Sequence, residues 1–107
     1  MPTPTHFFRY KEGGDNFVVY PITKKFDVTK DNYSAVYIFA DVDFIPLYIG
    51  ETEELAERIN NHEKLRMAKD NGCKFICVLK VSEAKREVIE DELIDVHKPR
   101  LNSPKLS

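Results

Sequence analysis

Two short apolar runs separated by four residues constrain this chain most, because so short a connection makes two strands lie adjacent and antiparallel. The runs cover residues 35–40 and 45–50, and the connection, residues 41–44, contains two aspartates. Apolar runs around a polar turn are typical of a β-hairpin. Side chains alternate along a strand, so Tyr37 and Tyr48 are each expected opposite their aliphatic neighbours. The sequence therefore predicts two tyrosines on one face of a hairpin.

Another hairpin is expected nearer the N-terminus. Residues 6–10 and 16–22 are rich in aromatic and β-branched side chains and flank a turn at Gly13 and Gly14. Such a hairpin either covers an exposed sheet edge or offers rings that stack on bases, and we expect edge cover. The polar residues 23–34 connect it to the next hairpin.

A helical pattern follows the second hairpin. Thr52 is expected to cap a helix that ends before Asn71. Its inner positions recur at helical spacing: Leu55, Ile59 and His62. Arg58 and His62 are four residues apart, and we expect them on one face of this helix.

A strand and a second helix complete the pattern. Residues 73–81 alternate as a strand, and residues 83–97 are predicted to form a helix that Pro99 ends. The expected inner stripe of this helix is Ile89, Leu93 and Val96. The order of elements predicts an α+β fold: a small, mostly antiparallel β-sheet flanked by helices, with an extra N-terminal β-hairpin.

The size of the chain predicts one domain. Its 107 residues fall within the usual range of a single domain and supply enough apolar side chains for one modest core. We expect one domain over residues 1–107, with an N-terminal hairpin extension at 1–34 and the core of the fold at 35–102.

Composition predicts the location of the protein. No apolar run approaches the ~18 to 20 residues of a membrane-spanning helix, and the first residues do not resemble a signal peptide, so we expect no membrane partner and a cytoplasmic protein. A reducing compartment would leave Cys73 and Cys77 as thiols. Strand spacing places both on one face, and core packing is favoured over zinc binding because no further soft ligands accompany them.

The charge balance disfavours strong, unspecific binding of nucleic acid. The formal net charge is −2 and the sequence pI is about 5.9, whereas phosphate binding depends on lysine and arginine. Distribution matters more than the total. A local basic strip beside Arg58 is expected from Lys64, Arg66, Lys69 and Lys74.

Several separated motifs follow one another in a recognisable order. They are Ala35-Val36-Tyr37, Tyr48-Ile49-Gly50, Arg58 and His62 in the helix that follows, Ile89-Glu90-Asp91-Glu92-Leu93-Ile94, and the closing Pro99-Arg100-Leu101-Asn102. Together they cover residues 35–102 and resemble the GIY-YIG nuclease family, whose members include the nuclease domain of the excision-repair C subunit and homing endonucleases. Ala35 stands where the first tripeptide usually has glycine, which affects backbone freedom and no reacting group.

The resemblance implies roles for four of these residues. Glu90 would anchor one divalent cation, Mg²⁺ or Mn²⁺, whose other ligands are waters and a phosphate oxygen. Arg58 would bind the scissile phosphate through its planar, always charged fork. Tyr37 or Tyr48 would position or deprotonate the attacking water, and Tyr37 ranks ahead.

Two further positions have supporting roles by the same resemblance. His62 would relay a proton, or orient a tyrosine or a phosphate, and Asn102 would fix the site through side-chain hydrogen bonds. Without the resemblance, the two tyrosines would be half-buried core aromatics, and Arg58, His62 and most carboxylates of the last helix would lie on solvated helix faces. Lys64, Arg66 and Lys74 are expected to contact the substrate.

The resemblance implies a metal-dependent endonuclease that acts on nucleic acid, with DNA as the expected substrate. A role in DNA repair is one of several that stay open, and a protein partner or a homodimer is left open as well. The alternative is a nucleic-acid-binding or interaction module that keeps the fold without turnover.

Overall fold

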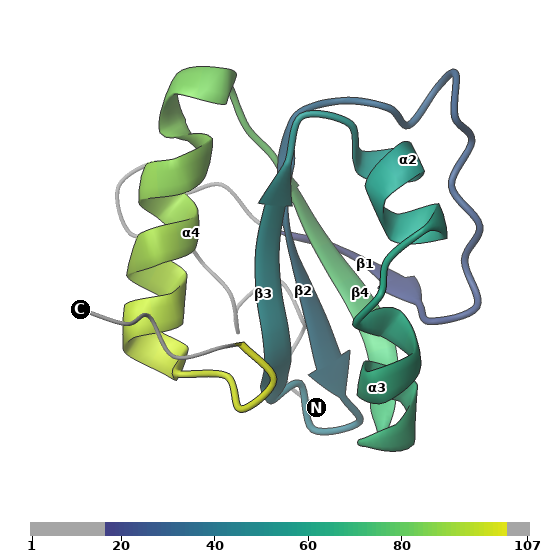
Figure 1. Cartoon of the computed structure of the whole chain (residues 1–107), viewed down its shortest axis with the longest axis vertical. Coiled ribbons are helices and arrows are strands. Elements are labelled where there is room, and N and C mark those ends of the chain that lie inside the picture. The colour runs from purple at the N-terminus through teal and green to yellow at the C-terminus, as the bar shows by residue number, and fades with distance from the viewer. Residues whose placement is uncertain (1–16, 103–107) are drawn as a thin grey trace.

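A four-stranded antiparallel sheet forms the centre of the structure, a computed structural model that describes residues 17–102 (Figure 1). The strand order is β1-β4-β2-β3, so β1 and β3 are the two edges. The predicted α+β fold with an antiparallel sheet is confirmed. The elements in chain order are β1 (Val18–Pro21), β2 (Ala35–Asp41), β3 (Pro46–Thr52), α2 (Leu55–Asn60), α3 (Leu65–Asp70), β4 (Cys73–Lys80) and α4 (Glu83–His97).

The predicted hairpin of β2 and β3 is present. Its turn is closed by the Asp41 carboxylate, which accepts the backbone N–H groups of Asp43 and Ile45, each at 2.9 Å. A side chain that bonds to the backbone two residues ahead is a common way to fix such a turn. Tyr37 and Tyr48 share one face, with ring centroids 6.3 Å apart.

The N-terminal run forms β1, which pairs with β4 at the edge of the sheet opposite β3. β1 lies antiparallel to β4, with Val19 opposite Cys77 and Pro21 opposite Phe75. Only the second strand of the expected N-terminal hairpin can be compared, because residues 6–10 lie outside the described residues.

The prediction of one helix from Thr52 to residue 70 is wrong, because the chain forms two short helices. α2 ends at Asn60, and α3 begins at Leu65. Between them, the imidazole Nδ1 of His62 accepts the backbone N–H of Lys64 at 3.0 Å. A side chain that bonds its own backbone in this way competes with helical hydrogen bonds. His62 therefore lies just beyond α2, and not on the same helix as Arg58.

The N-terminus of α2 is capped from a distant segment, so the expectation that Thr52 caps it is also wrong. Thr52 is the last residue of β3. Two N–H groups of the first turn donate to the carbonyl oxygens of Tyr33 and Asp31, at 3.0 and 3.2 Å. Another donates to the side-chain oxygen of Asn32 at 3.1 Å. The polar segment before β2 thus satisfies donors that a helix leaves unpaired.

Helices cover both faces of the sheet, α4 on one side and α2 with α3 on the other (Figure 1). Buried side chains on the α4 side include Val36, Ile38, Ile49, Cys77, Leu79, Ile89 and Leu93. Those on the opposite side include Tyr37, Phe39, Leu47, Leu55, Ile59, Ala68, Ile76 and Val78. Each fully buried aliphatic side chain contributes roughly 1.5 to 3 kcal/mol. Within residues 17–102, no helix has the length and apolar character that crossing a membrane requires.

The two cysteines are buried thiols, as expected, but they do not share a face. Cys73 packs on the α2 and α3 side, and Cys77 packs on the α4 side. The pairing of β2 with β4 shifts between Ala40 and Asp41, so that alternation is interrupted at this end of β4. Burial raises the pKa of Cys73 to about 11 and that of Cys77 to about 12, so both stay protonated at neutral pH.

The inner stripe of α4 differs from the prediction at one end. Ile89 and Leu93 are buried, but Val96 is 71% exposed. The stripe instead continues to the half-buried His97, and it begins at Arg86, which is 7% exposed. Spacings of three and four residues keep these side chains on one face of a helix with 3.6 residues per turn.

Arg86 is a buried cation that joins α4 to β3. Its guanidinium donates to the carboxylate of Glu51 and to the hydroxyl of Ser34, the latter at 3.1 Å. Oε1 of Glu53 lies 3.5 Å from Nη2 of Arg86 and adds a second negative charge. A buried charge is tolerated when it is paired and hydrogen-bonded in this manner. The contact fixes α4 beside the edge strand of the sheet.

Candidate active site

The residues singled out in the sequence meet at the β3 edge of the sheet. Tyr37 comes from β2, Tyr48 from β3 and Arg58 from α2, while His62 lies just after α2 and Glu90 lies on α4. The Tyr37 hydroxyl is 2.7 Å from Nε2 of His62. Arg58 and Glu90 both lie close enough to perturb the pKa of each tyrosine. Tyr37, Tyr48, Arg58 and His62 therefore form one group, and Glu90 lies within electrostatic reach of its two tyrosines.

Tyr37 reaches this edge because Gly50 has no side chain. The two residues are opposite each other in the register of β2 and β3. A Cβ atom on Gly50 would lie 2.9 Å from Cε2 of Tyr37 and still closer to its hydroxyl oxygen. The glycine of the second tripeptide is thus required for space. Its φ angle is not in the left-handed region, so backbone freedom is not the reason.

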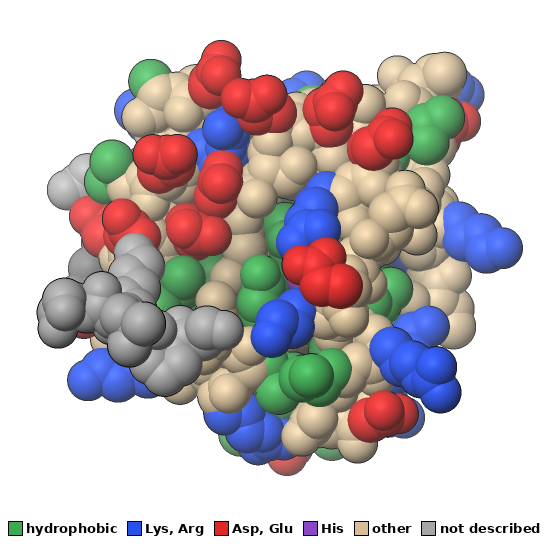
Figure 2. All heavy atoms as spheres, viewed as in Figure 1, with side chains coloured by type: hydrophobic (Ala, Val, Ile, Leu, Met, Phe, Trp, Pro, Cys, Tyr) green, Lys and Arg blue, Asp and Glu red, His purple; other side chains and the backbone are tan. Residues whose placement is uncertain are grey.

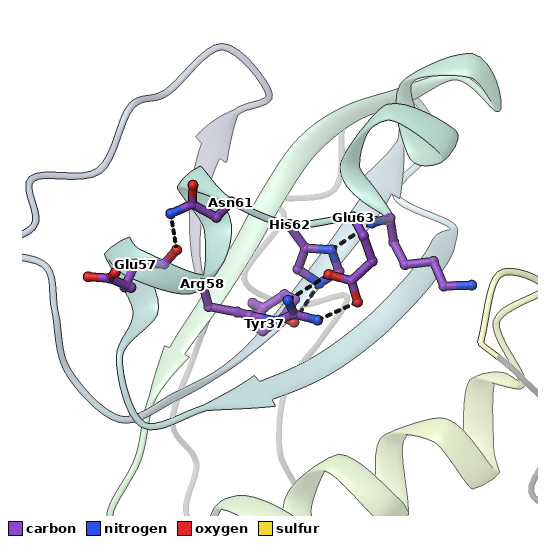
Figure 3. Close-up of polar contacts among 7 residues, drawn as sticks. Tyr37, Glu57, Arg58, Asn61, His62 and Glu63 are labelled. Atoms are coloured by element: carbon purple, nitrogen blue, oxygen red, sulfur yellow. Dashed lines mark hydrogen bonds and ion pairs between the residues drawn. The ribbon is translucent and has the colours of Figure 1, made fainter.

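The hydrogen bonds of His62 fix which ring nitrogen carries the proton. A backbone N–H can only donate, so Nδ1 of His62 is the acceptor in its 3.0 Å contact with Lys64. In a neutral imidazole the proton then sits on Nε2. The 2.7 Å contact with Tyr37 is therefore a bond in which Nε2–H donates to the phenol oxygen (Figure 3). In this tautomer His62 cannot take a proton from Tyr37.

The surroundings of His62 keep it neutral. It is 8% exposed, and its ring meets those of Tyr37, Phe39 and Tyr48 at centroid distances of 5.4, 5.0 and 5.1 Å. Burial, with Arg58 nearby, lowers the pKa of His62 to about 4. Neutral His62 is thus the state at physiological pH.

The two tyrosines differ in access to solvent. Tyr37 is 1% exposed, whereas Tyr48 is half-buried. Burial is the main cause that raises the pKa of each phenol, and the positive charge of Arg58 opposes that rise in both. Both hydroxyls are protonated at neutral pH. A tyrosine that acted as a base here would need further stabilisation of its phenolate.

Arg58 is held by an acidic neighbour that the sequence pattern did not indicate. Its two terminal nitrogens donate to the two carboxylate oxygens of Glu63, at 2.7 and 2.8 Å (Figure 3). These hydrogen bonds raise the pKa of Arg58 and hold the pKa of Glu63 at about 2. Glu63 lies five residues after Arg58, a spacing that pairs side chains only because the helix breaks between them.

Glu90 comes from α4, which packs on the opposite face of the sheet from α2. It is half-buried on α4, and its negative charge contributes to raising the pKa of both Tyr37 and Tyr48. A carboxylate is the oxygen ligand that Mg²⁺ prefers, and this ion is often held by one or two carboxylates with waters and substrate phosphates. Among residues 17–102, no cluster of three or more histidine, cysteine, aspartate or glutamate side chains forms a metal site. Glu90 fits a cation held by few protein ligands.

Asn102 fastens the segment after α4 to the outer edge of β3. Its side-chain oxygen accepts the backbone N–H of Ile49 at 2.9 Å, and its side-chain nitrogen donates to the carbonyl oxygen of Ile49 at 2.8 Å. Leu101 adds a backbone bond to Leu47 at 3.0 Å. These bonds cover an otherwise exposed strand edge. They hold the backbone between Tyr48 and Gly50.

The expected basic strip is only partly beside this group. Lys64 follows His62 and Glu63 directly, and Arg66 is exposed on α3. Lys74 lies at the start of β4, level with the end of β2 and beyond Tyr37 in the register. In Figure 2, acidic side chains gather over α4 and the upper end of this face, whereas the centre and lower part carry basic side chains with a few acidic ones among them. Basic side chains therefore do not form an unbroken strip on this face.

Sequence and structure comparisons agree on the class of protein. The sheet and its helices have the fold of a GIY-YIG nuclease domain. Residues 33–102 match the model of the GIY-YIG catalytic domain, and the chain belongs to this family. The resemblance noted in the sequence is confirmed. No curated protein sequence matches the chain.

Solved structures show the same fold. The GIY-YIG N-terminal endonuclease domain of UvrC from Thermotoga maritima, bound to its catalytic divalent cation magnesium, is 23% identical, with a TM-score of 0.61 over 71% of this chain and 90% of that chain. A point mutant of the same domain, bound to its catalytic divalent cation, is 23% identical, with a TM-score of 0.62 over 72% of this chain and 90% of that one.

Proposed function

We propose that this chain is a metal-dependent endonuclease that hydrolyses phosphodiester bonds of nucleic acid, with DNA as its expected substrate. One observation carries the proposal. Residues 33–102 match the GIY-YIG catalytic domain, and within them the Tyr37 phenol lies within electrostatic reach of the Arg58 guanidinium and the Glu90 carboxylate, which come from two other elements. A base, a cation and an anionic oxygen ligand are the groups that hydrolysis of a phosphodiester requires.

Arg58 is proposed to bind the scissile phosphate. Its guanidinium is always charged and offers two parallel N–H groups, which suit two phosphate oxygens. The side chain is 33% exposed, so a phosphate can approach it from solvent. As negative charge grows on the phosphate oxygens during attack, this fixed cation would stabilise the transition state.

Tyr37 is proposed to accept the proton of the attacking water, with Tyr48 positioning that water. The donor bond from Nε2–H of His62 points at the oxygen of Tyr37, where negative charge would form. A hydrogen bond to the charged form favours that form and offsets part of the cost of burial. His62 is thus proposed to support the phenolate and not to relay the proton. Asn102 would keep the β3 backbone beside Tyr48 in place.

Glu90 is proposed to hold the divalent cation, Mg²⁺ or Mn²⁺. When bound, such a cation polarises a phosphoryl oxygen and lowers the pKa of coordinated water. Glu90 would supply a carboxylate oxygen to that ion, and the Glu90 charge already acts on both Tyr37 and Tyr48.

The remaining expectations belong to the same proposal. Lys64, Arg66 and Lys74 would contact the substrate backbone away from the reacting phosphate. A protein partner or a homodimer would supply affinity that a chain of net charge −2 lacks. A cytoplasmic location and a role in DNA repair stay predictions, as does the division of one domain into residues 1–34 and 35–102. Two buried thiols suit a reducing compartment.

A binding or interaction module without turnover is the second candidate. The observation that favours it is the ion pair of Arg58 with Glu63, which occupies both terminal nitrogens of the arginine. An arginine that keeps this carboxylate has only its remaining N–H groups, and not this fork, to offer a phosphate.

A cleavage panel separates the two candidates. Labelled branched, nicked, duplex and single-stranded DNAs and RNAs would be incubated with the full chain in Mg²⁺ or in EDTA. We expect cutting of at least one substrate in Mg²⁺ only. Tyr37→Phe should reduce the rate more than Tyr48→Phe, because the first removes the proposed base. Binding without cutting, in a correctly folded protein, would support the module.

A further inference from the structure

Glu63 occupies one N–H group on each terminal nitrogen of Arg58, and this pair forms a fork that also suits a phosphate. Its carboxylate makes a bidentate contact at 2.7 and 2.8 Å. A planar carboxylate and a tetrahedral phosphate each present two oxygens that fit the same guanidinium fork. One ligand must leave before the other can bind with the same geometry. The inference below rests on the proposed role of Arg58 as a phosphate-binding residue.

Glu63 is placed so that it can leave. Its side chain is 64% exposed, and it lies in the short connection between α2 and α3. Exposed ion pairs contribute little to folding stability and are weakened by salt. Opening this contact would therefore cost far less than unpacking any core residue.

Arg58, in contrast, stays at the site. It belongs to α2, whose neighbouring residues Leu55 and Ile59 are buried in the core. Its charge acts on Tyr37 and Tyr48. In Figure 3 its guanidinium lies between the Tyr37 ring and the Glu63 carboxylate. A displaced Glu63 would leave this cation directed at the tyrosines.

Protonation does not open the contact under physiological conditions. The hydrogen bonds from Arg58 hold the pKa of Glu63 at about 2, so its carboxylate is charged at any pH near neutrality. Only another anion or added salt competes with it. An anion with two adjacent oxygens, such as a phosphodiester, is the competitor that the fork fits best.

We propose that Glu63 sets the substrate affinity of the site by competing with the backbone phosphate of nucleic acid for the same two N–H groups of Arg58. Glu63 is a specificity-determining residue in this scheme, because weakly held nucleic acid does not displace it from Arg58. Nucleic acid that a bound partner or other contacts on the chain concentrate at the site does displace Glu63.

Glu57 supplies a matched control. It is an exposed carboxylate on α2, one residue before Arg58, and in Figure 3 it points away from the arginine. Changing either glutamate to glutamine removes one negative charge and keeps the shape of the side chain. Only Glu63→Gln frees the guanidinium. A difference between the two variants therefore reports competition at Arg58 and not the total charge.

The first arm measures binding of a labelled oligonucleotide, single-stranded and duplex, to the full chain in EDTA, where no cutting is expected. Glu63→Gln should bind about two- to fivefold more tightly than the wild type, the range that an exposed ion pair corresponds to. Glu57→Gln should stay within about twofold. Equal gains in both variants would overturn the proposal, since charge alone would explain them. Weaker binding by Glu63→Gln would overturn it too, because Glu63 would then be orienting Arg58.

The second arm uses inorganic phosphate and does not depend on nuclease activity. Phosphate is titrated into protein labelled at arginine nitrogen, and the Nε signal of Arg58 is followed by NMR. The proposal requires a lower half-saturating phosphate concentration for Glu63→Gln than for the wild type or Glu57→Gln. Identical curves would overturn it even if the protein cuts DNA. A difference in these curves without cleavage of any substrate would instead refute the nuclease and leave the competition intact. No response of Arg58 in any protein would refute the competition and the phosphate-binding role of Arg58, and the cleavage panel would still decide whether the chain is a nuclease.

Discussion

The hydroxyl of Tyr37 lies over Gly50, in the space that a Cβ atom would occupy. This relationship joins the two tripeptides of the sequence in three dimensions, because the tyrosine of one needs the glycine of the other. It also places the Tyr37 oxygen within 2.7 Å of His62. A side chain at position 50 should therefore also break the hydrogen bond between Tyr37 and His62.

Gly50→Ala tests this dependence. The added methyl group would meet the rigid Tyr37 ring, which is buried and has little room to move. We expect a loss of about 1 to 3 kcal/mol in the free energy of unfolding, the usual cost of overpacking, and at least a tenfold fall in cleavage rate. Urea denaturation and initial rates measure the two effects. A variant with unchanged stability and rate would show that Tyr37 does not depend on the glycine.

The pH dependence of cleavage tests the assignment of the base. Burial raises the pKa of Tyr37, so its deprotonated fraction should increase about tenfold per pH unit throughout the range from 6 to 9. The logarithm of the rate should rise with a slope near one and show no plateau. Tyr37→Phe should lower the rate and change this slope. An inflection near pH 6.5 that disappears in His62→Gln would instead identify His62 as the proton relay.

His62 should also make the fold sensitive to mild acid. Its pKa is about 4 in the folded protein and about 6.5 in the unfolded chain, so the unfolded state binds more protons between these values. The free energy of unfolding should therefore fall as the pH decreases from about 6.5 to 4, by ~2 to 3 kcal/mol more than in His62→Gln. Denaturant titrations at several pH values measure the difference. Parallel curves for the two proteins would contradict a buried, neutral His62.

Asn102 should support both stability and activity. Asn102→Ala removes two hydrogen bonds to Ile49 on the edge strand. We expect the free energy of unfolding to fall by about 1 to 2 kcal/mol. The cleavage rate should also fall, because the backbone beside Tyr48 is no longer fixed. Asn71→Ala is the control, since its side chain bonds only locally, to the carbonyl oxygen of Met67. Equal effects of the two changes on the rate would show that Asn102 has no special place in the site.

Local alternation and a short turn were enough to predict the hairpin and the shared face of Tyr37 and Tyr48. The family resemblance identified Arg58 and Glu90, which no periodicity places near each other. The break after α2 was not predictable in the same way, because it depends on His62 turning its imidazole toward both Lys64 and Tyr37. Long-range contacts of this kind have no period in the sequence.

Two further differences have the same origin. The faces of Cys73 and Cys77 depend on a register shift between β2 and β4, which local alternation does not reveal. The pairing of Arg58 with Glu63 depends on the helix break, so a scan at helical spacing passes over it.

Cleavage by two matched carboxylate variants tests the nuclease proposal most directly. Glu90→Gln removes the proposed cation ligand, whereas Glu87→Gln removes an equal charge from an exposed position one turn earlier on α4. On the substrate that is cut best in Mg²⁺, Glu90→Gln should lower the initial rate at least about 100-fold, and Glu87→Gln should leave it within about twofold. Equal rates for Glu90→Gln and the wild type, with both proteins folded, would contradict a metal-dependent nuclease centred on Glu90.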